Sequence, residues 1–277
     1  MSRRLRPPAQ RRPKSHSNRG RLTMAPPTMK FRVLGPFEVT RGDEALALGG
    51  AKQRALLAIL LIEANHVVAL ERLAELLWRD DAPATADHII EVYVSQLRRA
   101  LEPTGAPYKV LVRKPSGYAL QVSPGELDAK EFEDLVKAAR TQPPEQAEEA
   151  LRAALGLWRG PALADFATEP FAVSEAARLN ELRLHAREEL IENEIKLGRH
   201  GQLIGELQAL VDEHPLRERL AGQLMLALYR SGRQAEASDI YQRTRERLVD
   251  ELGMEPGPDL QLLLKRILQQ DSALAAP

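Results

Sequence analysis

One stretch of the chain carries polar side chains that can hydrogen-bond to nucleic-acid bases. In residues 84–101, two arginines and one glutamine lie on or beside the side opposite an apolar stripe, together with a serine and a glutamate. Arginine and glutamine can form paired hydrogen bonds to guanine and adenine, and glutamate can accept one from cytosine. The residues expected on or beside this face are His88, Glu91, Tyr93, Ser95, Gln96, Arg98 and Arg99. The chemistry that this segment favours is readout of duplex DNA in the major groove.

The same spacing is also typical of an ordinary amphipathic surface helix. An apolar residue recurs every three or four positions, at Ile90, Val94, Leu97 and Leu101. Spacing alone favours the surface helix, but two neighbouring basic sites favour the nucleic-acid interpretation. They are Arg113 and Lys114 beside Ser116 at a predicted hairpin tip, and Lys52 and Arg54 where a helix begins. A hairpin tip suits contact with an adjacent groove, and a helix N-terminus suits phosphate.

The surrounding sequence predicts the elements that position these residues. Short β segments at 31–34, 37–40 and 45–48 are separated by turn residues. Helical periodicity follows at 52–64, 70–78 and 84–101, and two alternating segments, 109–113 and 118–122, flank a turn at 114–117. Strands, three helices and a closing hairpin, in that order, predict a winged helix-turn-helix.

Beyond residue 125 the chain is predicted to be almost wholly helical, with an internal repeat. Gly198 and Gly232 are 34 residues apart, each between two apolar helices. Pro215, Ala237 and Tyr241 then occupy positions typical of a tetratricopeptide-type repeat, although a leucine replaces one usual small residue. We expect a mainly α fold with a small β component, in which a winged helix-turn-helix precedes an α-helical tetratricopeptide-like repeat domain. The expected domains are a disordered basic tail (1–29), the winged helix (30–122) and the helical repeats (123–277).

The net charge is zero, but the charges are unevenly distributed. Residues 1–30 hold nine basic and no acidic residues, 31–122 hold eleven of each, and 123–277 hold nineteen basic and twenty-eight acidic. Any attraction to phosphate must therefore be local or come from the first segment, which lacks hydrophobic periodicity. An alternative is that translation starts at Met24 or Met29 instead of Met1, just before the first predicted strand.

Several classes of protein are excluded by what the sequence lacks. There is no cysteine, no histidine pair with metal-ligand spacing, no Gly-x-Ser-x-Gly elbow and no glycine-rich dinucleotide motif. The acidic doublets 148–149 and 188–189 are expected on solvated helix faces. The longest apolar run, 55–62, is far shorter than the ~20 residues that cross a bilayer. We expect no catalytic residue, metal or cofactor, no membrane contact, and a location in the cytoplasm with the nucleoid.

Longer motifs resemble a known family. GGAKQRALL at 49–57, LLW at 76–78, EVYVSQLRRAL at 91–101 and PSGY at 115–118 look like the OmpR-type DNA-binding domain of the Streptomyces antibiotic regulatory proteins. LDAKEF at 127–132, LWRGPAL at 157–163 and LGMEPGP at 252–258 resemble the bacterial transcriptional activator domain that follows it in that family. The resemblance extends over roughly residues 30–270, with the motifs in the family's order.

The resemblance implies a function and partners. Residues 85–101 would be the recognition helix, with Ser95, Gln96, Arg98 and Arg99 in its contact region, and Arg113 and Lys114 on the wing. Such proteins are activators that bind direct repeats in promoter DNA as dimers or tandem dimers and recruit RNA polymerase holoenzyme, often for secondary-metabolite gene clusters. Because the chain has no Gly-Lys dipeptide, a Walker A loop is excluded. We expect the short, stand-alone form of the family.

A different class of function stays open. In this alternative the chain is a helical-repeat adaptor or scaffold that uses its winged helix for protein contacts. The balanced charge of residues 31–122 supports it, and the basic residues of the third helix and the wing oppose it. If the chain is an activator, a fragment of residues 29–122 is expected to retain weak specific binding, with activation requiring residues 123–277.

The basic first segment generates a test. A chain that starts at Met29 is expected to bind DNA more weakly at low salt than one that starts at Met1, because it lacks eight of the nine basic residues before residue 31. The slope of log affinity against log salt should also become shallower, by roughly 0.9 for each phosphate that is no longer neutralised. Equal affinities at low salt would show that this segment has no part in binding.

Overall fold

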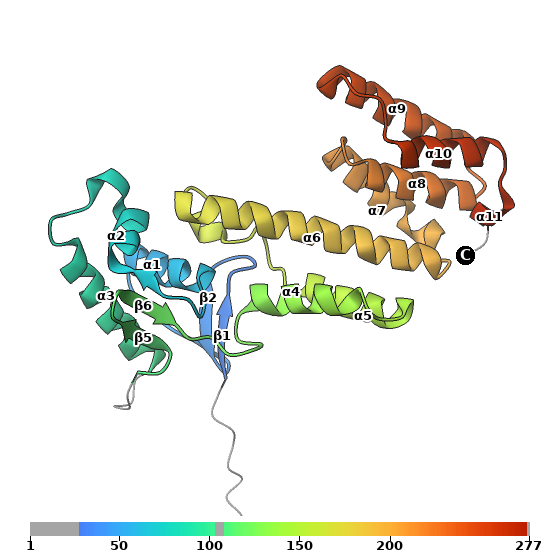
Figure 1. The fold of residues 1–277 in the computed structure, drawn as a ribbon. Helices are drawn as coiled ribbons and strands as arrows, with labels where there is room; N and C mark the ends of the chain where they lie inside the picture. The colour runs from blue at the N-terminus through green and yellow to red at the C-terminus, as the bar shows by residue number, and fades with distance from the viewer. Residues whose placement is uncertain (1–27, 103–107, 276–277) are drawn as a thin grey trace, which may run out of the picture.

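The first half of the chain folds around two small antiparallel sheets and three helices (Figure 1). The computed structural model describes residues 28–102 and 108–275, so the predicted basic tail lies almost wholly outside the described residues. One sheet has the order β1 (Met29–Arg32), β2 (Glu38–Arg41), β3 (Glu44–Ala45). The other has the order β4 (Val68–Ala69), β6 (Gly117–Leu120), β5 (Leu111–Lys114). The helices between them are α1 (Ala51–Ile62), α2 (Leu70–Trp78) and α3 (Ala86–Leu101).

The two-residue strand β4 is absent from the sequence-based expectation, because it is too short to show alternation. It pairs with β6 at Val68 with Tyr118 and at Ala69 with Gly117. A Cβ on Gly117 would lie only 2.0 Å from the Val68 carbonyl oxygen, so only glycine allows this close approach. The hairpin is thereby anchored to the start of α2.

The second half is a stack of helices. The first four are α4 (Asp128–Ala139), α5 (Pro144–Gly156), α6 (Pro170–Lys196) and α7 (His200–Glu213). The remainder are α8 (Glu218–Arg230), α9 (Gln234–Leu252), α10 (Pro258–Leu268) and the short α11 (Ser272–Ala275). Short 3₁₀ turns occur at Arg79–Asp81 and Ala164–Phe166. The fold class expected from the sequence is confirmed: a winged helix-turn-helix is followed by a helical repeat domain, and Gly198 and Gly232 lie between helices as predicted.

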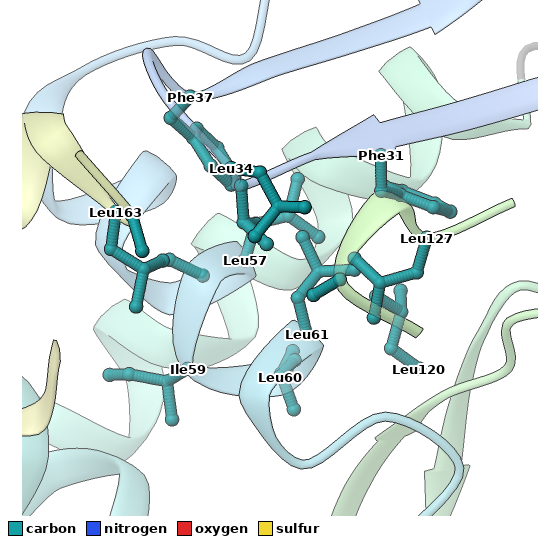
Figure 2. Packing of buried hydrophobic residues seen from close by; sticks show 14 of the residues in the cluster. Phe31, Leu34, Phe37, Leu57, Ile59, Leu60, Leu61, Leu120, Leu127 and Leu163 are labelled. Carbon is teal, nitrogen blue, oxygen red and sulfur yellow. The ribbon is translucent and has the colours of Figure 1, made fainter. Parts of the chain in front are cut away.

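The two halves share one hydrophobic core. Phe31 and Leu34 from the first half and Leu163 from the second are each fully buried in the same cluster. Figure 2 shows Leu127 and Leu163 among side chains of β1, the β1–β2 turn and α1. A second cluster is built from the C-terminal part of α6 together with α7–α11. The hydrophobic core therefore continues across residue 122, where the sequence pattern changes. A fragment of residues 29–122 would expose side chains of this core.

A buried carboxylate and a loop of the second half bind the backbone between β1 and β2. The Asp128 carboxylate accepts hydrogen bonds from the Val33 N–H, at 2.8 and 3.0 Å, and from the Leu34 N–H, at 3.1 Å. The Arg159 N–H donates to the Leu34 oxygen at 2.8 Å, and the Leu163 N–H donates to the Val33 oxygen at 2.7 Å. These bonds satisfy backbone groups that leave the sheet at the end of β1.

Gly35 allows the same loop to lie against the turn. Its φ is +142°, and a Cβ there would lie 2.9 Å from the Arg159 Cβ. The Phe37 N–H then donates to the Asp165 carboxylate at 2.9 Å. The turn and the loop therefore fit one another at backbone level.

Two acidic residues correct an expectation from the sequence. Glu148 and Glu188, expected on solvated faces, are 5% and 1% exposed. Glu148 pairs with Arg152 of its own helix and with Arg199, and Glu188 lies against Arg217 and Arg219. Arginines distant in sequence thus stabilise carboxylates that the helical pattern alone assigns to solvent.

None of the helices in residues 28–102 and 108–275 is both long enough and apolar enough to cross a membrane.

The role of Asp128 is testable by substitution. Asp128→Ala is expected to lower the free energy of unfolding by about 2–4 kcal/mol, because a buried N–H left without an acceptor costs about 1–3 kcal/mol. Urea unfolding of the full chain, followed by tryptophan fluorescence, measures the change. The matched control is Asp134→Ala on the same helix, whose exposed carboxylate pairs with Lys130 at the surface and contributes little.

The pH dependence gives a second readout for the same variants. Burial raises the pKa of the Asp128 carboxyl above its ordinary value, although the N–H groups of Val33 and Leu34 act in the opposite direction. The stabilisation tied to this shift is fully present below the ordinary pKa and is lost as pH rises through the raised value. The stability difference between wild type and Asp128→Ala should therefore be larger near pH 4 than at pH 7. A negligible difference at both values would contradict this role.

Candidate nucleic-acid interface

Helix α3 presents an exposed polar face opposite a buried stripe. The stripe agrees with the sequence prediction, and four of its residues are at most 2% exposed: Ile90, Val94, Leu97 and Leu101. Four of the contact residues predicted on this helix are exposed: His88, Glu91, Gln96 and Arg99. Tyr93 and Ser95 are half-buried at the edge of this face. A helix with such a face can lie in a B-form major groove with its polar side chains toward the base edges.

Helix α1 orients one of the exposed side chains of α3. The Gln53 amide N–H donates to Oε1 of Gln96, while Oε1 of Gln53 accepts the Gly50 N–H at 2.8 Å. One lone pair of the Gln96 oxygen is thereby used, and its NH₂ group is left to donate. The NH₂ group can donate to an acceptor on DNA, such as guanine O6, thymine O4 or a phosphate oxygen, and the second lone pair of the oxygen still allows paired hydrogen bonds to adenine.

Arg98 occupies a different place from the one expected. The sequence placed it outward on α3, but its Nε donates to the Leu111 carbonyl oxygen at 2.9 Å, and the side chain is half-buried. Its guanidinium carbon lies 4.5 Å from the centre of the Tyr108 ring and 5.9 Å from that of Tyr118. Through these contacts Arg98 joins α3 to strand β5. Its neighbour Arg99 is the arginine of the pair that faces outward.

The β5–β6 hairpin lies beside α3 and is joined to it by an ion pair. Arg113 donates to Oε1 of Glu91 at 2.8 Å and to the Tyr118 hydroxyl at 2.7 Å. The hydrogen bond to Glu91 raises the pKa of the Arg113 guanidinium above its ordinary value. Lys114 and Ser116, at the turn, are exposed. Glu91 therefore holds Arg113 and the hairpin beside α3, and its contact with cytosine stays a prediction. Arg113 and Lys114 are both exposed on the hairpin.

The basic residues at the start of α1 are engaged within the protein. Lys52 donates to the Leu77 carbonyl oxygen at 2.6 Å, at the C-terminal end of α2. Arg54 forms an ion pair with Asp165 from the second half of the chain. The sequence suggested phosphate binding for both residues. The structure gives both residues contacts within the protein, and their binding to phosphate stays a prediction.

Other residues that position α3 were missed by the sequence reasoning. Arg41 of β2 donates to the carbonyl oxygens of Ala100 and Leu101 at 3.1 and 2.7 Å, and so caps the C-terminal end of α3. Gln53, which lies between Lys52 and Arg54, was given no role from the sequence. A glutamine three residues after Gly50 is a capping-box position, which was the available signal for Gln53. No local signal indicates Arg41, because its partners lie about 60 residues away.

The exposed face of α3 and the hairpin tip together offer hydrogen-bond donors and positive charge to a polyanion. Gln96, Arg99 and Lys114 supply the donors, and Ser95 allows close approach because its side chain is short. Within residues 28–102 and 108–275, no group of histidine, aspartate and glutamate side chains could hold a metal ion. The arrangement suits binding to duplex DNA.

Two family models match the chain. The model "Transcriptional regulatory protein, C terminal" matches residues 44–120, and the model "Bacterial transcriptional activator domain" matches residues 127–268. The first contains α1, α2, α3 and the hairpin, and the second extends from α4 to α10.

Curated relatives and one solved structure agree with these matches. The regulatory protein AfsR of Streptomyces coelicolor is 43% identical over 89% of this chain, which spans only 25% of AfsR. The regulatory protein DnrI of Streptomyces peucetius is 35% identical, and the match covers 89% of this chain and 94% of DnrI. The structure of Mycobacterium tuberculosis EmbR in complex with a low affinity phosphopeptide is 37% identical, with a TM-score of 0.83, covering 90% of this chain and 68% of EmbR.

The two adjacent arginines of α3 generate a direct comparison. Arg98→Ala is expected to lower the free energy of unfolding by about 1–2 kcal/mol, because it removes a hydrogen bond and a stacking contact with Tyr108. Arg99→Ala, its matched control, should change stability by less than about 0.5 kcal/mol, as is usual for an exposed residue. Urea unfolding of both variants measures the difference. Equal losses of unfolding free energy in the two variants would show that Arg98 does not join α3 to β5.

Proposed function

Because the chain belongs to the Streptomyces antibiotic regulatory protein family of DNA-binding transcription regulators, we propose that it activates transcription at promoters that carry direct repeats. In this proposal α3 enters the major groove, the β5–β6 hairpin contacts neighbouring backbone or groove, and the second half helps to recruit RNA polymerase holoenzyme. The regulated genes belong to a secondary-metabolite cluster.

The observation that carries the proposal is the exposed face of α3 with an oriented donor. Gln96 is held by Gln53 with its NH₂ group free to donate, and Arg99 lies exposed on the same helix. An amide fixed before binding loses less conformational entropy on forming its contact with DNA. The ion pair between Glu91 and Arg113 holds the hairpin beside this face.

Charge supports a division of labour between the halves. Residues 123–277 hold nine more acidic than basic residues, so phosphate repels this half. Two copies on direct repeats would sit about 34–36 Å apart, one helical turn, on one side of the duplex. The acidic helical repeats then point away from DNA, where they contact the adjacent copy or polymerase. This arrangement needs no cofactor.

The adaptor alternative makes a different prediction about salt. A winged helix that binds protein would show little dependence on nucleic acid or ionic strength, whereas each neutralised phosphate lowers affinity as salt rises. Elution from heparin and the nucleic acid that co-purifies with the chain distinguish the two functions.

The outward donors of α3 provide the mutational test. On a duplex selected from random sequence by the wild-type chain, Gln96→Glu is expected to weaken binding by about 1–3 kcal/mol, the usual cost of removing one base-reading side chain. The new carboxylate still accepts from Gln53 but no longer donates, and it repels phosphate. Arg99→Ala should weaken binding by a similar amount. Gel-shift titration at fixed salt measures both.

Matched controls lie on the far half of the chain. Gln202→Glu on α7 and Arg247→Ala on α9 change exposed residues of the same types and should leave DNA affinity unchanged. Wild-type affinity in both α3 variants, with all proteins folded, would contradict the groove assignment.

A further inference from the structure

A cavity lies at the seam between the two halves of the chain. Its volume is about 530 Å³, within the usual range for sites that hold small molecules. Leu61 and Ile62 at the C-terminal end of α1 line it from the first half, and Ala129 of α4 and Leu179 of α6 line it from the second. Residues 122–124, which connect β6 to α4, also line it. An occupant of this space would contact both halves at once.

The inner wall of the cavity is apolar. Val33, Leu127 and Leu163 line it, and each is less than 8% exposed. These side chains belong to the core shared by the two halves, so the wall is fixed by packing on its other side. Such a surface favours an occupant with an apolar body, because binding removes apolar area on both partners from water.

The charged residues at the rim are already paired with one another. Arg178 of α6 donates to Glu133 of α4 at 2.6 Å and to Glu175 at 2.7 Å. Lys130 lies 3.1 Å from Asp134 and 3.5 Å from Glu133. A charged ligand would have to break one of these pairs or be partly desolvated without a partner, and both are costly. An anion would also face three carboxylates and only two cations, so the rim selects against anions.

The turn that follows α1 is held in one conformation beside the cavity. Asn65 has a φ of +68°, which asparagine tolerates better than most residues. Its side chain donates to the Val122 oxygen at 3.1 Å and accepts the Val122 N–H at 2.9 Å, while its backbone N–H donates to the Leu120 oxygen at 2.9 Å. The connection between the halves is therefore tied to the end of α1, and this wall is formed before any ligand binds.

We propose that this cavity binds a neutral, largely apolar small molecule of drug-like size, and that the ligand modulates DNA binding through α1. One end of α1 lines the cavity, and the other carries Gln53, which orients Gln96. A ligand that contacts α1, α4 and α6 together stabilises the observed position of α1, in which Gln53 holds the donor on α3. The regulatory part of this proposal rests on the proposed function, whereas the site itself does not.

The site is tested with a pair of fluorescent probes that share one aromatic body. N-phenyl-1-naphthylamine is neutral, and 1-anilinonaphthalene-8-sulfonate adds a negative charge. The full chain, without DNA, should bind the neutral probe saturably, at least tenfold more tightly than the anionic one, and its melting temperature should rise on binding. Absence of saturable binding would overturn the site. Equal or tighter binding of the anionic probe would overturn the assignment of a neutral ligand.

Variants locate the probe in the cavity. Ala64 follows α1, is half-buried and lines the cavity. Ala64→Phe therefore fills the cavity and should weaken binding of the neutral probe at least tenfold. Ala64→Leu, a smaller and less disruptive change, should give an intermediate effect. Ala138→Phe adds the same ring at an exposed position of α4 and should have no effect. Binding that is unchanged in both folded Ala64 variants would show that the probe lies elsewhere.

The regulatory part is tested by adding DNA. Saturating neutral probe should change the affinity for the selected duplex by about fivefold or more, and this shift should disappear in Ala64→Phe. Unchanged DNA affinity with the probe bound would overturn regulation through α1. Lack of DNA binding both with and without the probe would instead contradict the proposed function and leave the site intact.

Discussion

The structure depends on the bond between the Asp128 carboxylate and the backbone at the end of β1. Val33 and Leu34 leave the sheet at this point, and their N–H groups would be buried without acceptors if Asp128 were absent. The loop that follows α5 completes the arrangement by donating from Arg159 and Leu163 to the same segment. As a result the winged helix and the first helices of the second half pack as one body around a common core (Figures 1 and 2).

This constraint extends to the exposed face of α3. Asp165, on the loop that binds the β1–β2 turn, pairs with Arg54 at the start of α1, and Gln53 beside it holds Gln96 on α3. The position of the exposed donor is therefore linked through α1 to the second half. In a regulator built this way, one connected structure would contact DNA through α3 and a protein partner through the helical repeats, and the ligand proposed for the cavity between the halves would act on both.

Local pattern was sufficient for much of the fold. The helix expected at 70–78 is present at Leu70–Trp78, and the apolar stripe of α3 is buried, because both follow from the helical period of neighbouring residues. The hydrogen-bond partners of long polar side chains were less predictable from the sequence. Lys52 and Arg98 donate hydrogen bonds to the carbonyl oxygens of Leu77 and Leu111, respectively. A helical pattern does not reveal these partners. Long side chains have many possible partners, and the partner is chosen by tertiary contact.

The absence of cysteine from the chain allows a direct measurement of the central claim, that the exposed face of α3 lies in the major groove. A Gln96→Cys chain is mixed with its selected duplex, in which one base carries a disulfide tether in the major groove, and crosslinked complex is quantified. The account predicts efficient crosslinking at one or two base positions of each repeat and none from Gln202→Cys. Equal yields from the two cysteines, or no crosslink from α3 at any tethered position, would contradict it.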